Sequence, residues 1–283
     1  MRTPADRRTA AGHPADLLSD TGEPLGRRPA WRVGAKSLRK QLRQIRDSVA
    51  AVCEESGVED IHQMRVATRR LRTMARVLEA TPAFRRGRVS RLRRELQPLA
   101  DRLGAVRDLD ILLQHLSDYE GTAEQKDEAD KTSSALRDTL VRRREKALDR
   151  LRQTLQHSQM QKLLRHPRRV AKRLATRNRR GRRLLVRHVA GSALWTRYEA
   201  ILSYEDAVAH AATTRQLHAI RIACKQLRYA LELFSVDDDP CGQALIQTLK
   251  QTQDYLGDLQ DSVFAISLLT QMRHDAPRDP VRE

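Results

Sequence analysis

The sequence has little of what disulfide-bonded, metal-binding or membrane-spanning proteins require. Its three cysteines are an odd number without metal-ligand spacing, so we expect neither a disulfide framework nor a metal site. No apolar run approaches the roughly 18 residues of a membrane-spanning helix, and no apolar leader follows Met1. These absences predict a soluble, cytoplasmic protein with reduced cysteines and no insertion into membranes.

Aromatic side chains are also scarce, with three Phe, five Tyr and two Trp among 283 residues. Proteins that bind single-stranded nucleic acid stack its bases on exposed aromatic rings. Most aromatic residues here, such as Phe234 and Tyr255, instead fit the apolar periodicity of helices. No helix-turn-helix, zinc-finger or RNA-binding signature is visible either. Nucleic acid is therefore a less favoured partner than a polyanion that lacks bases.

Acidic residues are outnumbered by basic ones, 36 against 54, which gives a formal net charge of +18. The surplus is uneven, because residues 137–187 contain 19 Lys or Arg and three acidic residues. Such a concentration of charge repels itself unless a polyanion neutralises it. It favours polyphosphate, nucleic acid or an anionic membrane surface as the partner. The alternative is a basic linker that only keeps the protein soluble.

What the sequence does contain is an internal repeat of a basic helix face. Two segments 156 residues apart share the series His, Arg, Arg or Lys, and Arg at positions i, i+3, i+7 and i+10. On an α-helix these positions fall within an arc of about 80° and extend along about 15 Å, which suits a linear polyanion. The two basic rows are His62, Arg65, Arg69 and Arg72, and His218, Arg221, Lys225 and Arg228.

An apolar stripe runs beside each basic row. Apolar residues from Met64 to Leu78 follow the alternating spacing of three and four that is typical of a core-facing helix, and residues from Ile220 to Phe234 repeat it. We therefore expect each helix to bury its apolar side and to hold its basic row at the edge of the core. A solvated charged face, the ordinary alternative, has no need to preserve side-chain type twice.

The repeat organises the whole chain. Leu96–Asp108 matches Leu249–Asp261 at an offset of 153, and an amphipathic helix precedes both basic rows. The pattern between Trp31 and Met272 is helical and is interrupted at Gly and Pro positions. The predicted fold class is therefore all-α, with about four helices per repeat.

The same pattern divides the chain into three parts. We predict a disordered arm at residues 1–31, one helical domain at 32–273 and a tail at 274–283. The domain contains a first repeat at about 32–160, a basic connector at about 161–182 and a second repeat at about 183–273.

Further basic residues are weaker candidates for the site. Arg76 continues the first row, whereas Glu232 occupies the equivalent position of the second. Arg107 has Gln260 as its counterpart, which leaves its binding role open. The preceding helix carries a row with the same spacing that faces either the ligand or solvent, namely Lys36, Arg39, Arg43 and Arg46.

The two basic rows and the segments that follow them resemble the CHAD family, the conserved histidine α-helical domain. The following segments are Leu103-Gly104-x-x-Arg107-Asp108 and Leu256-Gly257-x-x-x-Asp261, and the resemblance covers about residues 32–273. Such membership implies two pseudo-twofold-related four-helix bundles in one domain, with paired basic helices lining a central groove or pore. It also implies that the eight residues of the two rows bind inorganic polyphosphate, with an association with polyphosphate granules.

Two catalytic interpretations are weaker. The repeat-matched aspartates could hold magnesium for phosphoryl chemistry, but partnership with nearby arginines explains them more simply. A histidine could accept a phosphoryl group, yet neither His62 nor His218 has a base or orienting acid at a fixed position. We therefore predict a binding protein rather than an enzyme, without a cofactor. Electrostatic binding of nucleic acid, or a scaffold role, stays the alternative.

Overall fold

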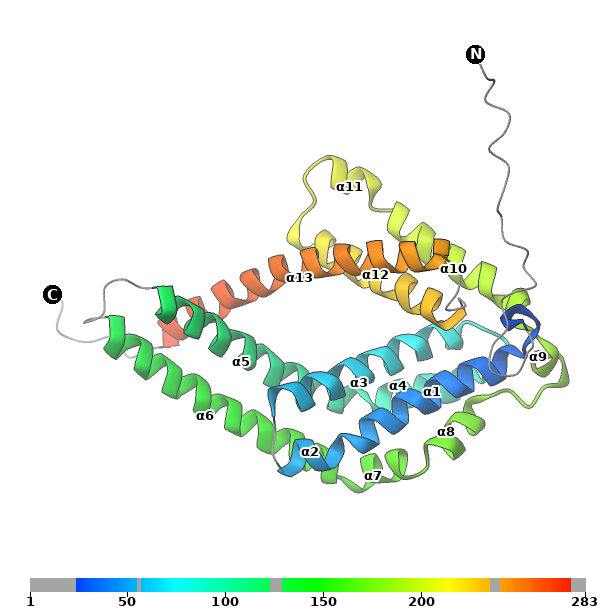
Figure 1. The fold of residues 1–283 in the computed structure, drawn as a ribbon, viewed down its shortest axis with the longest axis horizontal. Helices are drawn as coiled ribbons and strands as arrows, with labels where there is room; N and C mark the ends of the chain where they lie inside the picture. The colour runs from blue at the N-terminus through cyan, green and yellow to red at the C-terminus, as the bar shows by residue number, and fades with distance from the viewer. Residues whose placement is uncertain (1–23, 55–56, 123–128, 235–239, 276–283) are drawn as a thin grey trace, which may run out of the picture.

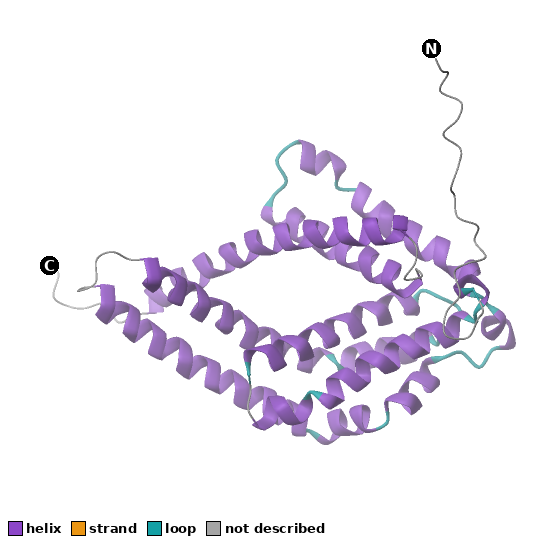
Figure 2. Ribbon diagram, viewed as in Figure 1, coloured by secondary structure: helices purple, strands orange, loops and turns teal. Residues whose placement is uncertain are grey.

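The computed structural model describes residues 24–54, 57–122, 129–234 and 240–275, and within these ranges the chain is almost entirely helical (Figures 1 and 2). The predicted all-α fold class is confirmed. The elements in chain order are the 3₁₀ helix η1 (Leu25–Arg27), α1 (Ala30–Asp47), α2 (Val49–Glu54), α3 (Val58–Glu79), α4 (Arg86–Glu95), α5 (Gln97–Thr122), α6 (Ala129–Gln156), α7 (Ser158–Arg165), α8 (Pro167–Leu174), α9 (Arg179–Arg183), α10 (Val186–Leu202), α11 (Glu205–Ala209), α12 (Thr214–Phe234) and α13 (Pro240–Asp275).

The internal repeat is visible in the boundaries of the helices. A shift of 156 residues carries α1 onto α10 and α3 onto α12, with ends that agree within one residue. A shift of 153 carries α4 and α5 together onto the single helix α13. Among the described residues, α6 has no counterpart after α13. The described second half thus has three long helices and the short α11, and the expected pair of four-helix bundles is not confirmed.

A proline explains why two helices of the first half correspond to one helix of the second. Pro98 has no amide hydrogen, so it cannot donate to the carbonyl of Arg94 and it interrupts the helical ladder. Leu96 separates α4 from α5 at this point. Gln251 occupies the equivalent position in α13, which continues without a break.

Most of the buried core belongs to the first half. The apolar stripes of α1 and α3 pack together, and Leu38 and Leu71 are completely buried. The last turns of α12 join this core through Leu233 and Phe234. A smaller cluster, which includes Cys224 and residues of α10 and α13, supports the rest of the second half. Because apolar burial is the main stabilising contribution, the described residues of the second half bury less apolar surface to stabilise it than those of the first.

The connector lies on the outside of the first half. Helices α7 and α8 pack against α1, and α9 leads into α10. Helix α7 begins at Ser158, near the predicted start of the connector at about 161. Within the described residues, no helix is long and apolar enough to cross a membrane.

The last residues of the predicted arm are hydrogen-bonded to the segment where α10 begins. The Ala30 amide donates to the carbonyl oxygen of Leu184 at 2.9 Å, and the Val186 amide donates to that of Arg28 at 2.9 Å. Residues 28–30 are therefore fixed against the start of α10. Residues 1–23 of the predicted arm and residues 276–283 of the predicted tail lie outside the described residues.

One face of α13 is less covered than the matching face of α5. Val106 of α5 is fully buried, and Asp110, one turn later, pairs with Arg144 of α6. Their repeat-matched counterparts on α13, Leu259 and Val263, are 46% and 41% exposed. Figure 1 shows α6 running beside α5, with no equivalent helix drawn beside α13 among the described residues.

Candidate functional site

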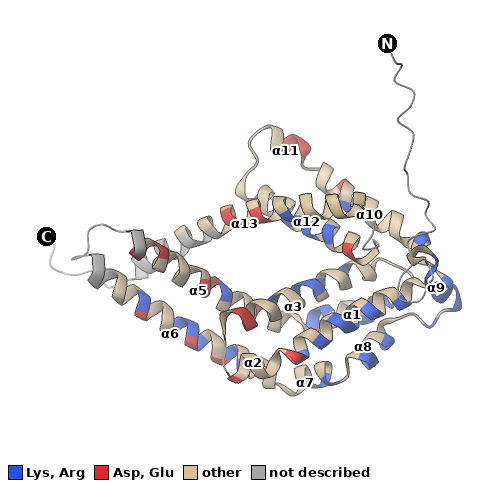
Figure 3. Cartoon of the chain, viewed as in Figure 1, with Lys and Arg blue, Asp and Glu red and all other residues tan. Residues whose placement is uncertain are grey.

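The two helices that carry the basic rows, α3 and α12, pack against each other; Figure 1 labels both helices and Figure 3 shows Lys and Arg on each of them. A cavity of about 300 Å³ lies where they meet. Parts of α4 and α5 complete its walls. Six lining side chains are cationic and, among the described lining residues, none is a carboxylate. The six cations are Arg65, Arg69, Arg72, Arg76, Arg93 and Lys225.

The apolar stripe of α3 fixes the position of its basic row. Met64 and Leu71 are completely buried, while Arg65, Arg69 and Arg72 beside them are half-buried. The row is therefore held at the edge of the core with restricted access to water, as its spacing predicts. On α12, Ile220 and Leu227 fix the second row in the same way.

Lys225 is the most strongly perturbed cation of the cavity. Burial lowers its pKa from an ordinary 10.5 to about 8, and the positive charges of Arg69, Arg221, Arg65 and Arg76 act in the same direction. The free protein thus holds the charged form of Lys225 against both desolvation and repulsion. A bound anion relieves both penalties.

The arginines of the first row are similarly placed. Burial lowers the pKa of Arg65, and the charges of Arg69, Arg107 and Arg221 reinforce the effect while Asp108 opposes it. The Nε atoms of Arg69 and Arg72 are shielded from solvent and have no hydrogen-bond partner within the described structure. Buried donors without acceptors cost free energy, so an anion that supplies acceptor oxygens stabilises the cavity.

Gln260 orients the start of the second row. Its Oε1 atom lies 2.8 Å from His218 Nδ1 and accepts a hydrogen bond of 2.9 Å from Arg221 Nη1. Because an amide oxygen only accepts, Nδ1 of His218 carries the hydrogen and Nε2 is left for a ligand. The sequence shows only that Gln260 replaces Arg107, and the structure gives this replacement a positioning role.

His62 begins the first row in a different environment. It is half-buried, and desolvation together with the charge of Arg107 lowers its pKa below the ordinary 6.5, with Glu59 acting in the opposite direction. The imidazole is therefore mostly neutral at pH 7 in the free protein. The two copies differ here, since an extra cation faces His62 where an amide faces His218.

The far ends of the two rows also differ. Arg76, a weaker candidate from sequence, lines the cavity, and Arg72 donates a hydrogen bond to Gln97. Arg228 is absent from the described lining; its guanidinium lies 3.6 Å from the Glu232 carboxylate and 4.7 Å from the centre of the Tyr229 ring. Among the described lining residues, Lys225 represents the second row, whereas the first row continues past the matching Arg69 to Arg72 and Arg76.

The remaining weaker candidates lie elsewhere. Arg43 and Arg46 line a separate cavity of about 560 Å³ with basic residues of the connector, on the outer side of α1. Lys36 is exposed and Arg39 is half-buried, and neither lines the central cavity. Arg107 lines a third cavity of about 620 Å³ with Asp110 and Asp258. The described connector thus forms a basic outer surface and does not line the central cavity.

Two cations near the cavity have no counterpart in the sequence repeat. Arg93 of α4 lines the cavity, and its Nη1 atom lies 2.5 Å from Glu79 Oε2. Arg197 of α10 is buried, and desolvation together with the charge of Arg76 lowers its pKa. The repeat places Ile246 and Gln41 at the matching positions, so no pattern in the sequence singles these two arginines out.

The aspartates of the first copy act mainly on arginines. Asp110 accepts a hydrogen bond of 2.6 Å from Arg144 Nε, and Asp108 acts on Arg65. The side chain of Asp261, which matches Asp108 in the second copy, lies outside the described residues. In the part of the chain that the structure describes, no three His, Cys, Asp or Glu side chains gather as metal ligands do.

The fold and the cavity define an all-α repeat protein with an internal cationic site. The family model named CHAD domain matches residues 36–270, which is most of the chain, so the chain belongs to the CHAD domain family.

Solved structures show the same fold. The crystal structure of the CHAD domain from the plant Ricinus communis is similar at a TM-score of 0.70 and 23% sequence identity, over 89% of this chain and 82% of that chain. PptA from Streptomyces chartreusis is similar at a TM-score of 0.66 and 17% identity, over 90% of this chain and 89% of that one. No curated protein matches the sequence.

Proposed function

We propose that the protein binds inorganic polyphosphate in the cavity between α3 and α12. One observation carries the proposal: six cations line this cavity, and none of its described lining residues is a carboxylate. Arginine forks and lysine ammonium groups are the side chains that phosphate oxygens prefer. Membership of the CHAD family and the resemblance of the two rows to its basic motifs support the same ligand.

The geometry favours a linear polyanion over a single phosphate. Arg65 and Arg76 are eleven residues apart on one helix, which separates them by about 16 Å along its axis. A lone phosphate contacts a few of these cations and leaves the others to repel one another. A phosphate chain satisfies the whole row and needs no stacking ring, which fits the scarcity of aromatic residues.

The proposed role is binding without catalysis. His218 directs Nδ1 to the neutral amide of Gln260 rather than to the carboxylate that orients a catalytic histidine. Burial and Arg107 lower the pKa of His62, which makes it a weak base. We expect the chain length of bound polyphosphate to stay unchanged on incubation, as gel electrophoresis would show. The proposed location is the cytoplasm, at polyphosphate granules.

The alternative is electrostatic binding of nucleic acid by the connector. It rests on the second basic cavity, where Arg168, Arg169 and Lys172 face Arg43 and Arg46. The two functions therefore predict that different residues contribute to affinity: those of the central cavity for polyphosphate and those of the connector for nucleic acid.

A competition experiment separates them. Labelled polyphosphate and labelled RNA are each displaced by the other at matched phosphate concentration and salt. We expect polyphosphate to displace RNA far more readily than the reverse. The Lys225→Met variant should lose at least about tenfold in affinity for polyphosphate, because a charge-assisted bond contributes about 1.5 to 3 kcal/mol. Equal competition, or equal losses in Lys225→Met and Arg168→Ala, would contradict the proposal.

A further inference from the structure

The central cavity is too small for a long polyphosphate chain. Its volume of about 300 Å³ corresponds to about ten water molecules at roughly 30 Å³ each. Each phosphate unit of a chain adds four heavy atoms, so the cavity holds only a few units. A longer chain has to continue over the surface, and the surrounding charges decide where.

The end of the two basic rows where His62 and His218 lie is a poor exit for a polyanion. The cavity beyond Arg107 contains Asp258 and the buried pair of Asp110 with Arg144, whose atoms are 2.6 Å apart. Cations and carboxylates are thus mixed there. The opposite end of the central cavity is formed by Arg72 and Arg93, and further cations follow it.

Three concave sites follow one another from this opposite end. The central cavity shares Arg72 and Arg93 with a cleft of about 560 Å³ at the junction of α4 and α5. That cleft shares Arg94 and Pro98 with an outer cavity of about 750 Å³ between α4, α5, α6 and α7. The shared lining residues make the three sites neighbours, and we call this series of sites, from the interior to the outer face, the path.

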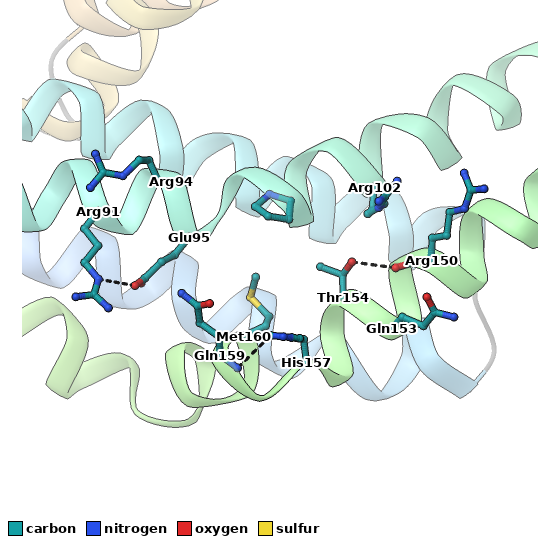
Figure 4. Close-up of a pocket in the computed structure, with 11 residues that line it drawn as sticks. Arg91, Arg94, Glu95, Arg102, Arg150, Gln153, Thr154, His157, Gln159 and Met160 are labelled. Atoms are coloured by element: carbon teal, nitrogen blue, oxygen red, sulfur yellow. Dashed lines mark hydrogen bonds and ion pairs between the residues drawn. The ribbon is translucent and has the colours of Figure 1, made fainter.

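Arginine side chains that can bind an anion line the outer cavity (Figure 4). Arg94 and Arg102 lie along one side of it, with His157 on the other, and Arg150 lies at its end. In the described structure these three arginines make no ion pair. Among the described lining residues the one carboxylate is Glu95, which accepts a hydrogen bond of 2.7 Å from Arg91 Nε.

The carboxylates Glu79 and Asp101, which lie near the α4–α5 junction, already have hydrogen-bond or ion-pair partners. Glu79 pairs with Arg93, at a distance of 2.5 Å. Asp101 accepts a hydrogen bond of 2.6 Å from Gln97 Nε2, and the Oε1 atom of the same amide accepts from Arg72. Gln97 therefore links Arg72 to Asp101.

The path exists on one side of the repeat only. Pro98 breaks the helix in the first half, whereas α13 is continuous. The positions of Arg94 and Arg102 correspond to Gln247 and Tyr255, which carry no charge. The exit is therefore a feature of the first copy, where the proline-induced break and the arginines occur together.

We propose that a long polyphosphate chain leaves the central cavity over the α4–α5 junction and occupies the outer cavity as a second binding segment. This inference rests on the proposed function of the central cavity. It gives the protein a preference for long chains, because a short chain that fills the central cavity does not reach Arg94, Arg102 and Arg150. Long chains gain the additional phosphate contacts and release more counterions.

The test compares ligand lengths in the full chain. The Arg94→Ala, Arg102→Ala, Arg150→Ala triple variant removes three exposed cations, so its fold is preserved, which circular dichroism checks. Affinities for tripolyphosphate and for long-chain polyphosphate are measured over a range of salt concentrations. We expect long-chain affinity to fall at least tenfold and its salt dependence to drop by about two units of slope, at about 0.7 to 0.9 per phosphate contact. Tripolyphosphate affinity should stay unchanged.

The control is Arg142→Ala, Arg143→Ala, Lys146→Ala, which removes the same charge from exposed positions of α6 that line none of the three sites. The control should leave long-chain affinity within about twofold of the wild type. Equal losses in the two triple variants, or unchanged long-chain affinity in the first, would overturn the exit path while tripolyphosphate binding still upholds the central site. If the wild type binds neither ligand, the proposed function fails as well.

Discussion

At the scale of single residues, the candidate site consists of cations that the fold holds close together. Lys225 shows this most clearly, because burial and neighbouring arginines bring its pKa to about 8. Packing of the surrounding helices offsets the free energy needed to keep this charge partly buried. A bound anion stabilises the charged form of Lys225, so affinity and the protonation of Lys225 are linked.

The linkage predicts a pH dependence. Because a bound polyanion raises the pKa of Lys225 above its value of about 8 in the free protein, affinity is highest below pH 8. It should fall as pH rises from 8 towards 10, a range in which the ligand's own charge is constant. Isothermal titration calorimetry over this range measures the effect. Lys225→Met should bind more weakly with a flat profile, whereas an equally steep profile in that variant would rule Lys225 out as the titrating group.

The free energy of unfolding should respond in the opposite direction. The folded-state pKa of Lys225 lies below its unfolded value, so between about pH 8 and 10.5 the unfolded state binds more protons. The ligand-free protein should therefore gain stability as pH rises through this window. Urea denaturation of the wild type and Lys225→Met measures it, and the gain should be absent from the variant. A wild type that gains no more stability than the variant would contradict the perturbed pKa.

Gly257 offers a second test at the residue scale. A Cβ atom added there would lie 3.0 Å from Nη2 and 3.5 Å from Cζ of Arg221, so the guanidinium must move. Gly257→Ala should weaken polyphosphate binding several-fold. Gly191→Ala is the matched control. Gly191 lies on another long helix, α10, and a Cβ atom added there meets nothing within 4 Å. Both changes raise helix propensity. Unchanged affinity in Gly257→Ala would show that the position of Arg221 does not matter.

At the scale of helices, the two copies of the repeat differ in how well they are covered. The fully buried Val106 and the 46% exposed Leu259 occupy matching positions on α5 and α13. Val106→Ala should lower the free energy of unfolding by about 1 to 3 kcal/mol because it leaves a cavity. Leu259→Ala should cost less than about 1 kcal/mol. Chemical denaturation measures both values, and equal losses would mean that α13 is covered in solution.

The helices themselves were largely predictable, because burial of the apolar stripe and exposure of the polar face leave a periodic pattern. The resemblance to the CHAD family predicts the pairing of α3 with α12 and of their basic rows. The repeat does not predict the uncovered face of α13, since Leu259 fits the apolar periodicity whether or not a neighbour is present. It also misses Arg93 and Arg197, which reach the cavity region from α4 and α10 and lack repeat-matched cations.

Which cations of each row line the cavity was less predictable from the sequence. Arg76 and Arg228 are both basic and both follow the spacing, yet Arg76 lines the cavity and Arg228 turns to Glu232 and the Tyr229 ring. Side-chain direction at the end of a helix depends on neighbours from distant segments. Gln260 is a similar case, because its hydrogen bonds to His218 and Arg221 join residues about forty positions apart.

At the scale of the whole molecule, net charge and site geometry are separate. The connector carries much of the surplus charge on exposed positions of α7, α8 and α9, outside α1 (Figure 3). Such a surface raises the rate at which any polyanion arrives and has little power to select among polyanions. We therefore propose that selection among polyanions belongs to the cavity between the halves, where Arg69, Arg72 and Lys225 are half-buried.

The most direct measurement is a crystal structure of the full chain with polyphosphate bound. We predict continuous density for a phosphate chain between α3 and α12, with phosphate oxygens within hydrogen-bond distance of Arg69 and Lys225. Density confined to the outer surface of α8 and α9, with the central cavity unchanged, would contradict the account.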